Sequence, residues 1–145
     1  MNPIEILEQE HRDIERELIE LESIIDGGVI NYPNLIHVFN KLCSIWDPHE
    51  EKEEKIFSIM EKEKIKFPVY TMLCEHRDLR GHKNAIKEAI QSRNEFKLKK
   101  ALNEHGRIII SKLRKHINDE DEVLYTITLQ EFTPKELAEL WKSVN

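Results

Sequence analysis

The chain has 145 residues, of which 28 are acidic and 22 are Lys or Arg, giving a net charge of −6. With 39% hydrophobic residues, 4 Gly and 5 Pro, it is expected to form one folded, helical domain over residues 1–145, not a disordered chain. General nucleic-acid binding is disfavoured, because phosphate contacts require a basic surface.

The N-terminal stretch MNPIEILEQEH lacks the basic end and apolar run of a signal peptide. No apolar stretch approaches the roughly 20 residues that span a bilayer, so no membrane association is predicted. Cys43 and Cys74 form no CxxC motif, and we interpret them as buried or free thiols of a cytoplasmic protein. A disulfide between them is the minor alternative.

Two long helices are predicted in the first half of the chain. In the first, over residues 3–26, Asn2 can cap and Pro3 can start the helix, and His11 occupies a place in the apolar stripe where Leu is expected. The second covers residues 33–62, and its stripe includes His49 and Glu53. Pro48 lies inside it and should bend the turn before His49.

Three more helices are predicted in the second half. Residues 68–91 carry His76, with Lys83 where an apolar residue is expected, and residues 95–129 carry His116 and Glu120. A capping box at residues 133–136 opens a short helix over residues 134–144 that should cover one end of the fold. The apolar stripe of the fourth helix continues through Val123 and Ile127, and the face of the fifth comprises Leu137, Leu140, Trp141 and Val144. The expected fold is all-α, an up-down-up-down four-helix bundle with a short C-terminal helix.

The four stripe histidines should lie at one height in such a bundle. Residues of antiparallel neighbours are level when they are equally far from the connecting loop, and His11 and His49 satisfy this for the loop at residues 27–33. His49 and His76 lie about equally far from a loop near residues 61–67, and His76 and His116 from the turn at residues 92–94. At about 1.5 Å rise per residue, the misfits amount to only a few ångströms.

Glu53 and Glu120 each follow a stripe histidine by four residues, which places each acid on the same helix face. Burying such carboxylates would be costly unless a cation balanced them. Nitrogen and hard oxygen ligands without thiolate suit iron, manganese or zinc, and bundle cores hold dinuclear sites. The sequence therefore predicts a metal site, most naturally with two metals bridged by carboxylates.

The remaining histidines are not expected to join this site. His37 lies between Leu35 and Val38 in the sequence and is expected on the surface. His82 is six residues from His76 and is turned away from it around the helix. His105 returns near the face of His116, but about 16 Å along the helix axis. A single histidine in an apolar stripe is usually an ordinary core residue, so the prediction depends on the four histidines together.

Two sequence echoes accompany these positions: EHRDI at residues 10–14 and EHRDL at 75–79, and HxxxE at residues 49–53 and 116–120. The order H…HxxxE…H…HxxxE resembles the hemerythrin-like, HHE cation-binding domain over nearly the whole chain. The resemblance implies a four-helix bundle with a non-haem diiron centre, or manganese or zinc in its place. Its ligands would be His11, His49, His76 and His116, bridged by Glu53 and Glu120. The two halves then look like a duplicated helix hairpin, in which the Arg-Asp after each EHRD histidine is expected to be exposed.

Three positions qualify the resemblance. Glu50 directly follows His49, and in the iron-sensing F-box relatives the corresponding residue is a further ligand, so the resemblance makes Glu50 a candidate sixth or seventh metal ligand here. Oxygen-carrying hemerythrins have a fifth histidine where this chain has Arg80, and their last acid would fall on Asp121, an alternative to Glu120. The resemblance therefore implies metal binding without implying reversible oxygen carriage.

The leading functional hypothesis is a cytoplasmic diiron protein that binds iron and responds to O₂, peroxide or NO, in sensing, storage or detoxification. An open iron position partly lined by Trp46, Cys43 or Leu79 would admit the small molecule, and a protein partner would supply any signalling output. One alternative is a diiron enzyme, either a peroxidase or oxidase or a protein that repairs iron centres. The other is a metal-free helical interaction module. The sequence leaves the oligomeric state open.

Overall fold

The first three long helices begin and end within one residue of their predicted bounds in the computed structural model, which describes residues 2–143. They are α1 (Pro3–Asp26), α2 (Tyr32–Lys62) and α3 (Val69–Gln91). The Asn2 side chain caps α1 in a complete capping box with Glu5, and the Asn31 side chain accepts from the backbone of Asn34 to start α2. These caps satisfy backbone N–H groups that a helix leaves without internal partners.

The fourth long helix contains two π-helical turns that the sequence did not reveal. It runs as α4 (Glu95–Ala101), η1 (Leu102–Gly106), α5 (Arg107–Asp119), η2 (Glu120–Leu124) and α6 (Tyr125–Glu131), with right-handed helical backbone at the junctions between them. A π turn contains an extra residue, which rotates the following side chains around the helix axis.

The second π turn changes which residues reach the core after Glu120. The prediction that Val123 is buried was wrong, since 43% of this side chain is exposed. Leu124, Tyr125 and Thr128 are buried instead, and Ile127 is half-buried. The prediction from α-helical spacing is wrong after Glu120 because the extra residue of the π turn moves the apolar face by one position.

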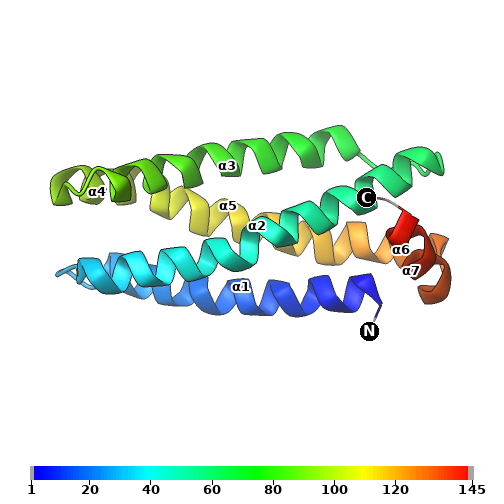
Figure 1. Ribbon diagram of the computed structural model, residues 1–145, viewed down its shortest axis with the longest axis horizontal. Coiled ribbons are helices and arrows are strands. Elements are labelled where there is room, and N and C mark those ends of the chain that lie inside the picture. The colour runs from blue at the N-terminus through cyan, green and yellow to red at the C-terminus, as the bar shows by residue number, and fades with distance from the viewer. Residues whose placement is uncertain (1, 144–145) are drawn as a thin grey trace.

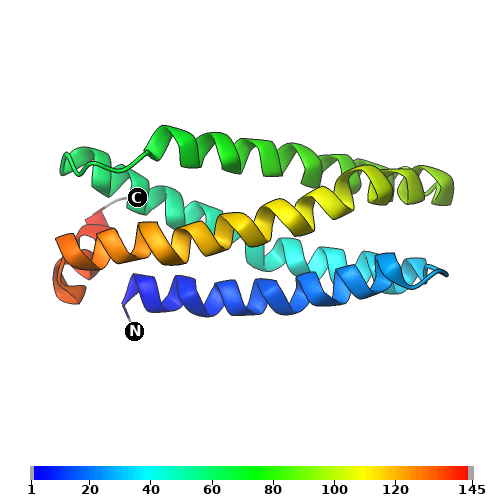
Figure 2. The same cartoon turned by 180° about the vertical axis from the view of Figure 1, so that it is seen from behind.

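The four long helices lie side by side and alternate in direction, as Figures 1 and 2 show from opposite sides. The short helix α7 (Pro134–Ser143) lies at the bundle end that holds the N-terminus and packs against α1 and α2. Residues 2–143 contain no strand, so the all-α bundle with a short C-terminal helix is confirmed. Val144, predicted on the apolar face of the last helix, lies outside the described residues.

Helix α2 continues through Pro48 without interruption but changes direction near its middle. This agrees with the predicted bend, because proline removes one backbone hydrogen bond and its ring displaces the preceding turn. The first half of α2 follows α1 closely, and the second half diverges from it (Figure 1). Pro48 directly precedes His49, a buried residue of the polar layer of the core.

The core consists of two apolar clusters separated by one polar layer. The larger cluster fills the end of the bundle near the α1–α2 loop and includes Leu18, Leu42 and Leu113. The smaller one fills the end covered by α7 and includes Leu7, Ile56 and Leu137. On every long helix, the stripe histidine lies between the residues of the two clusters. Apolar packing on both sides therefore holds the polar layer in place.

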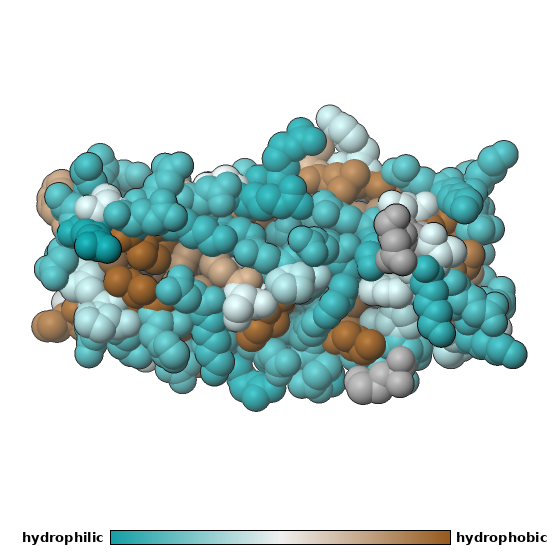
Figure 3. All heavy atoms as spheres, viewed as in Figure 1, coloured by the Kyte–Doolittle hydropathy of each residue, from teal (hydrophilic) through white to brown (hydrophobic). Residues whose placement is uncertain are grey.

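The outer surface is mainly hydrophilic, with separate apolar patches on the face drawn in Figure 3. No helix among residues 2–143 is long and apolar enough to cross a membrane. Cys43 and Cys74 are both free, the first buried and the second half-buried. Lys83 fills its apolar stripe position as a buried side chain, because its ammonium group bonds to Asp47 and lies 4.4 Å from the ring centre of Trp46.

Candidate metal centre

Six buried side chains from all four long helices meet in the polar layer, and we call them the His/Glu cluster. No member is more than 4% exposed. They are His11 from α1, His49 and Glu53 from α2, His76 from α3, His116 from α5 and Glu120 from the start of η2. All six were predicted from their spacing, and the structure brings them together.

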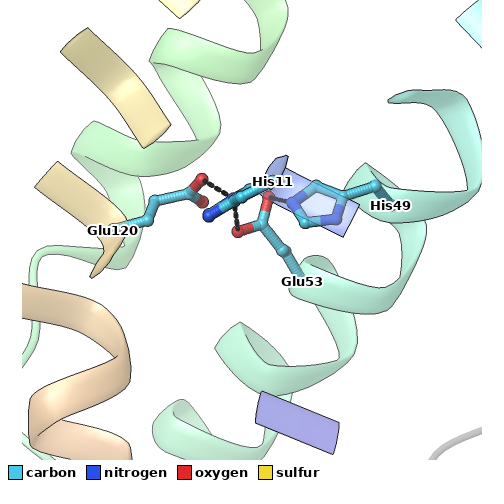
Figure 4. A group of neighbouring side chains, drawn as sticks. All are labelled: His11, His49, Glu53 and Glu120. Atoms are coloured by element: carbon cyan, nitrogen blue, oxygen red, sulfur yellow. Dashed lines mark ion pairs between the residues drawn. The ribbon is translucent and has the colours of Figure 1, made fainter. Parts of the chain in front are cut away.

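The cluster forms two overlapping groups that each offer four metal-ligating atoms within 4.8 Å of one another. The first group is His11, His49, Glu53 and Glu120, and the second is Glu53, His76, His116 and Glu120. Figure 4 shows the first group, with Glu120 and Glu53 approaching His11 from different sides. Because both acids belong to both groups, the cluster has the ligand arrangement of a carboxylate-bridged dinuclear site.

The two carboxylate oxygens of Glu120 face different groups. Its Oε1 lies 3.2 Å from His11 Nε2, and its Oε2 lies 3.2 Å from His116 Nε2 and 3.8 Å from His76 Nε2. Glu53 connects the groups through one oxygen, since its Oε1 lies 3.3 Å from His49 Nε2 and 3.5 Å from His76 Nε2. Each acid therefore lies within reach of ligands from both hairpins.

The outward-facing nitrogens of the histidines meet a surrounding ring of carboxylates. Glu10 Oε1 lies 3.1 Å from His49 Nδ1, and Glu75 Oε2 lies 2.9 Å from His116 Nδ1. These two acids open the EHRD repeats, and each orients the histidine of the neighbouring helix. A carboxylate in this position fixes the imidazole so that its other nitrogen faces a metal. Sequence reasoning missed both acids, although the repeat itself was the signal.

The Arg-Asp residues of the repeats have no such contact with the cluster. Asp13 bonds to Arg16 and Gln9, and Asp78 accepts from Lys112 at 2.7 Å. Arg12, Arg77 and Asp78 are exposed and Asp13 is half-buried. Their repetition therefore marks the duplicated helix pattern, whereas the preceding Glu carries the contact with the site.

Two predicted acids lie beside the cluster, outside both groups. Glu50 is buried, but its Oε2 accepts from Arg80 Nε at 3.2 Å and lies 4.0 Å from His76 Nδ1. Asp121 lies 2.9 Å from His11 Nδ1, with its side chain 44% exposed. Asp121 thus faces the outward nitrogen of a histidine, while Glu120 faces the interior of the cluster.

Tyr125 is a member of the polar layer that sequence reasoning missed. Its hydroxyl group donates to Glu53 Oε2 at 2.9 Å and lies 3.1 Å from His11 Nε2, and the side chain is buried. Burial, followed by the negative charges of Glu53 and Glu120, raises the pKa of this phenol, so the hydroxyl stays protonated. The π turn before it brings Tyr125 inward, and a purely α-helical count gives no signal for it.

The charged groups of the cluster shift one another's pKa values. Burial lowers the pKa of His49, but the charge of Glu53 and the neighbouring carboxylates of Glu10 and Glu53 outweigh it and raise that pKa to about 10. Burial also lowers the pKa of His76 and of His116, but the carboxylates of Glu120 and Glu53 outweigh it. They raise the pKa of His76 to about 10 and that of His116 to about 8. Burial raises the pKa of Glu120, yet its neighbours Glu53 and three histidines hold it well below the usual range.

The unpaired atoms of the cluster fit a metal. Among the described residues, five buried side-chain atoms have no hydrogen-bond partner. Two are Glu50 Oε1 and His76 Nδ1, and the other three are His49 Nε2 and both carboxylate oxygens of Glu120. Leaving buried polar atoms unpaired costs about 1–3 kcal/mol each. All three atoms face the two ligand groups, so cations placed there would satisfy them. The ligands are imidazoles and carboxylates without thiolate, a set that suits iron, manganese or zinc.

A pocket of about 350 Å³ adjoins the second group from outside, between α3 and α5. It is lined by Thr71, Cys74, Glu75, Asp78, Leu79, Lys112, Lys115 and His116. Of the three residues expected to line an opening, only Leu79 takes part. Trp46 and Cys43 are instead buried in the larger apolar cluster.

The other three histidines lie outside the cluster, as predicted. His37 is exposed, and His82 and His105 are half-buried. His82 and His105 contact each other, with their Nδ1 atoms 3.0 Å apart. Sequence reasoning did not anticipate this pair.

Comparison with known families supports the geometry. The family model described as the hemerythrin HHE cation binding domain matches residues 2–128, a range that contains the whole His/Glu cluster. Searches of curated proteins and of solved structures gave no significant match.

Proposed function

The chain belongs to the hemerythrin HHE cation-binding family, and from this premise we propose that its His/Glu cluster holds two iron ions in a non-haem diiron centre. The observation that carries the proposal is the sharing of Glu53 and Glu120 by two buried groups of four ligands. Two cations in these groups would offset the negative charge of the two buried carboxylates that the groups share. Manganese or zinc would fit the same ligand atoms, so the choice of iron is the point to be tested.

Each residue would have a defined role. His11 and His49 would hold one iron, His76 and His116 the other, and Glu53 and Glu120 would bridge them. Glu10 and Glu75 would fix the imidazoles of His49 and His116 through the hydrogen bonds described above. Glu50 and Asp121 would act on the centre from its surroundings, because each faces the outward nitrogen of a histidine.

We propose that the centre binds a small molecule, such as O₂, peroxide or NO, in sensing, storage or detoxification. Iron ions held by six protein side chains would supply reversible electron transfer and coordination positions for such a molecule. The pocket beside His116 and Leu79 supports access on the side of the second group. On the other side, the Tyr125 ring stacks on His11 with centroids 5.3 Å apart and covers that part of the layer.

A diiron peroxidase or oxidase is the second candidate function, and the same pocket favours it. A pocket of about 350 Å³ lined by Cys74, Leu79 and two lysines has room for an organic reductant beside the bound small molecule. Steady turnover of peroxide that depends on an added reductant would support this function. Stoichiometric binding without turnover would support the binding protein.

The first experiment is to purify the untagged protein from iron-supplemented cells and measure the metal per chain and the absorption spectrum. About two irons per chain, with a near-ultraviolet charge-transfer band that bleaches on anaerobic reduction, would support the proposal. Absence of bound metal, with a melting temperature that Fe(II) leaves unchanged, would overturn it and favour a metal-free helical module.

A further inference from the structure

His82 on α3 and His105 in the π turn η1 form a histidine pair away from the His/Glu cluster. Their Nδ1 atoms lie 3.0 Å apart, and their ring centres lie 5.2 Å apart. His105 precedes His116 by eleven residues, about 16 Å along the helix. This pair is therefore separate from the candidate diiron centre, and no residue is shared between them.

The geometry of the pair resembles that of two histidines inside the cluster. His76 and His116 approach each other with Nε2 atoms 3.0 Å apart and ring centres 4.9 Å apart. Two bonds of about 2.0–2.1 Å from one tetrahedral zinc ion would place its two nitrogen ligands about 3.4 Å apart. Half-buried side chains can supply the few tenths of an ångström needed, because only side-chain rotation is involved.

Carboxylates face the far nitrogens of both rings. Asp78 Oδ1 lies 3.7 Å from His82 Nε2, and Glu104 Oε2 lies 3.8 Å from His105 Nε2. At these distances a water molecule can bridge the groups. Carboxylates behind metal-bound imidazoles orient the rings and fix which nitrogen faces the metal. The cluster shows the same arrangement, with Glu75 behind His116.

The local backbone adds a second parallel between the two sites. The fourth long helix has two π turns among its described residues, one beginning at Glu120 and one containing His105. π turns in α-helices occur frequently at functional sites, because the extra residue redirects a side chain. The turn η1 packs tightly against α1, since a Cβ atom at Gly106 would lie only 3.0 Å from Ile25 Cδ1.

From these observations we propose that His82 and His105 form a second metal site, which takes a divalent transition-metal ion such as Zn²⁺. Two imidazoles favour zinc, copper or nickel over magnesium or calcium, which prefer oxygen ligands. The side chains are 18% and 29% exposed, so water can fill the remaining coordination positions. With two protein ligands, the site binds more weakly than the cluster, and it connects α3 to the fourth long helix.

The test is a calorimetric titration of the full chain with Zn²⁺ after its cluster has been loaded with iron and free metal removed. We expect one further zinc ion per chain, with the iron content unchanged during the titration. His82→Asn and His105→Asn should each weaken this binding at least about tenfold, because half of the protein ligands are lost. His37→Asn, at an exposed histidine of α2, is the matched control and should bind like the unmodified chain.

Absence of further zinc binding by the unmodified chain would overturn the proposal and leave the pair as a simple hydrogen bond. Equal zinc binding by the two variants and by the control would also overturn it. Helical content and iron content of each variant show whether it has folded. If the cluster takes up no iron, the difference between the variants and the control still tests this site, so the two proposals fail independently.

Discussion

The two hairpins of the bundle supply the same ligands to one centre but surround them differently. In each hairpin, the Glu that opens the EHRD repeat bonds to the histidine of the neighbouring helix: Glu10 to His49 and Glu75 to His116. Each hairpin also contributes one shared acid, Glu53 or Glu120. The ligands themselves are therefore symmetric, as expected for a duplicated hairpin.

The surroundings break this symmetry. The His11–His49 side is covered by Tyr125, whose hydroxyl group bonds to Glu53 and contacts His11. The His76–His116 side adjoins a pocket, and His76 Nδ1 has no hydrogen-bond partner. The ligands of the two hairpins are therefore alike while their surroundings differ. A surface pocket adjoins the centre on both sides, since His11 and Asp121 line a second pocket of about 310 Å³.

The largest effect is expected from Glu120→Ala, because this acid belongs to both sides of the centre. Its removal takes one carboxylate oxygen from each ligand group, so the metal content should fall from about two ions per chain to near zero. His11→Ala should leave the His76–His116 side able to retain metal. Metal analysis of both purified variants tests this, and equal metal contents would contradict the shared role of Glu120.

The two acids of the EHRD repeats offer a direct test of the symmetric part. Glu10→Gln and Glu75→Gln should each weaken metal binding by about 10- to 100-fold, since each orients one imidazole. The two losses should be similar, because the contacts are 3.1 and 2.9 Å long. Competition with a chelator measures them. Glu88→Gln, an exposed position on α3, is the control, and a loss of the same size there would show that the effect is general.

The metal-free protein should lose stability as the pH rises above neutrality. The folded pKa of His49 and His76 is about 10 and that of His116 about 8, against an ordinary value of 6.5. Raised histidine pKa values contribute stability fully below pH 6.5, and this contribution disappears as the pH passes the folded values. The contribution of His116 should disappear first, near pH 8.

Metal-loaded protein should not show this fall, because metal ligands are neutral imidazoles. The increase in melting temperature caused by metal should therefore grow between pH 6.5 and 10. Melting curves of both forms over this range measure it. An increase that is constant with pH would show that the histidines are not protonated in the metal-free cluster.

The smallest effect is expected from Tyr125→Phe, which removes one hydrogen bond and leaves all six residues of the cluster in place. Loss of its hydrogen bond to the Glu53 carboxylate should lower the stability of the metal-free protein by about 1.5–3 kcal/mol, without reducing the metal content. Chemical denaturation and metal analysis test this together. Tyr70→Phe is the matched control, since that side chain is 79% exposed. A halved metal content in Tyr125→Phe would instead make the phenol a metal ligand.

The sequence by itself determined the helices and the six residues of the cluster. Apolar stripes with a helical period specify the buried face of each helix, and equal distances from the loops place residues of antiparallel helices at one height. The spacing of four residues between histidine and glutamate then brings each acid onto the same face. These features follow from the regular geometry of α-helices and from the positions of the loops, and both can be read from a single sequence.

Only the tertiary structure decided what surrounds the cluster. The π turn at Glu120 brings Tyr125 inward and leaves Val123 exposed, and regular α-helical periodicity cannot anticipate an extra residue in a turn. The contacts of Glu10 with His49, Arg80 with Glu50, and His82 with His105 all join different helices. Which side chains meet across two helices depends on their rotation and lateral packing, and these are set by the whole core.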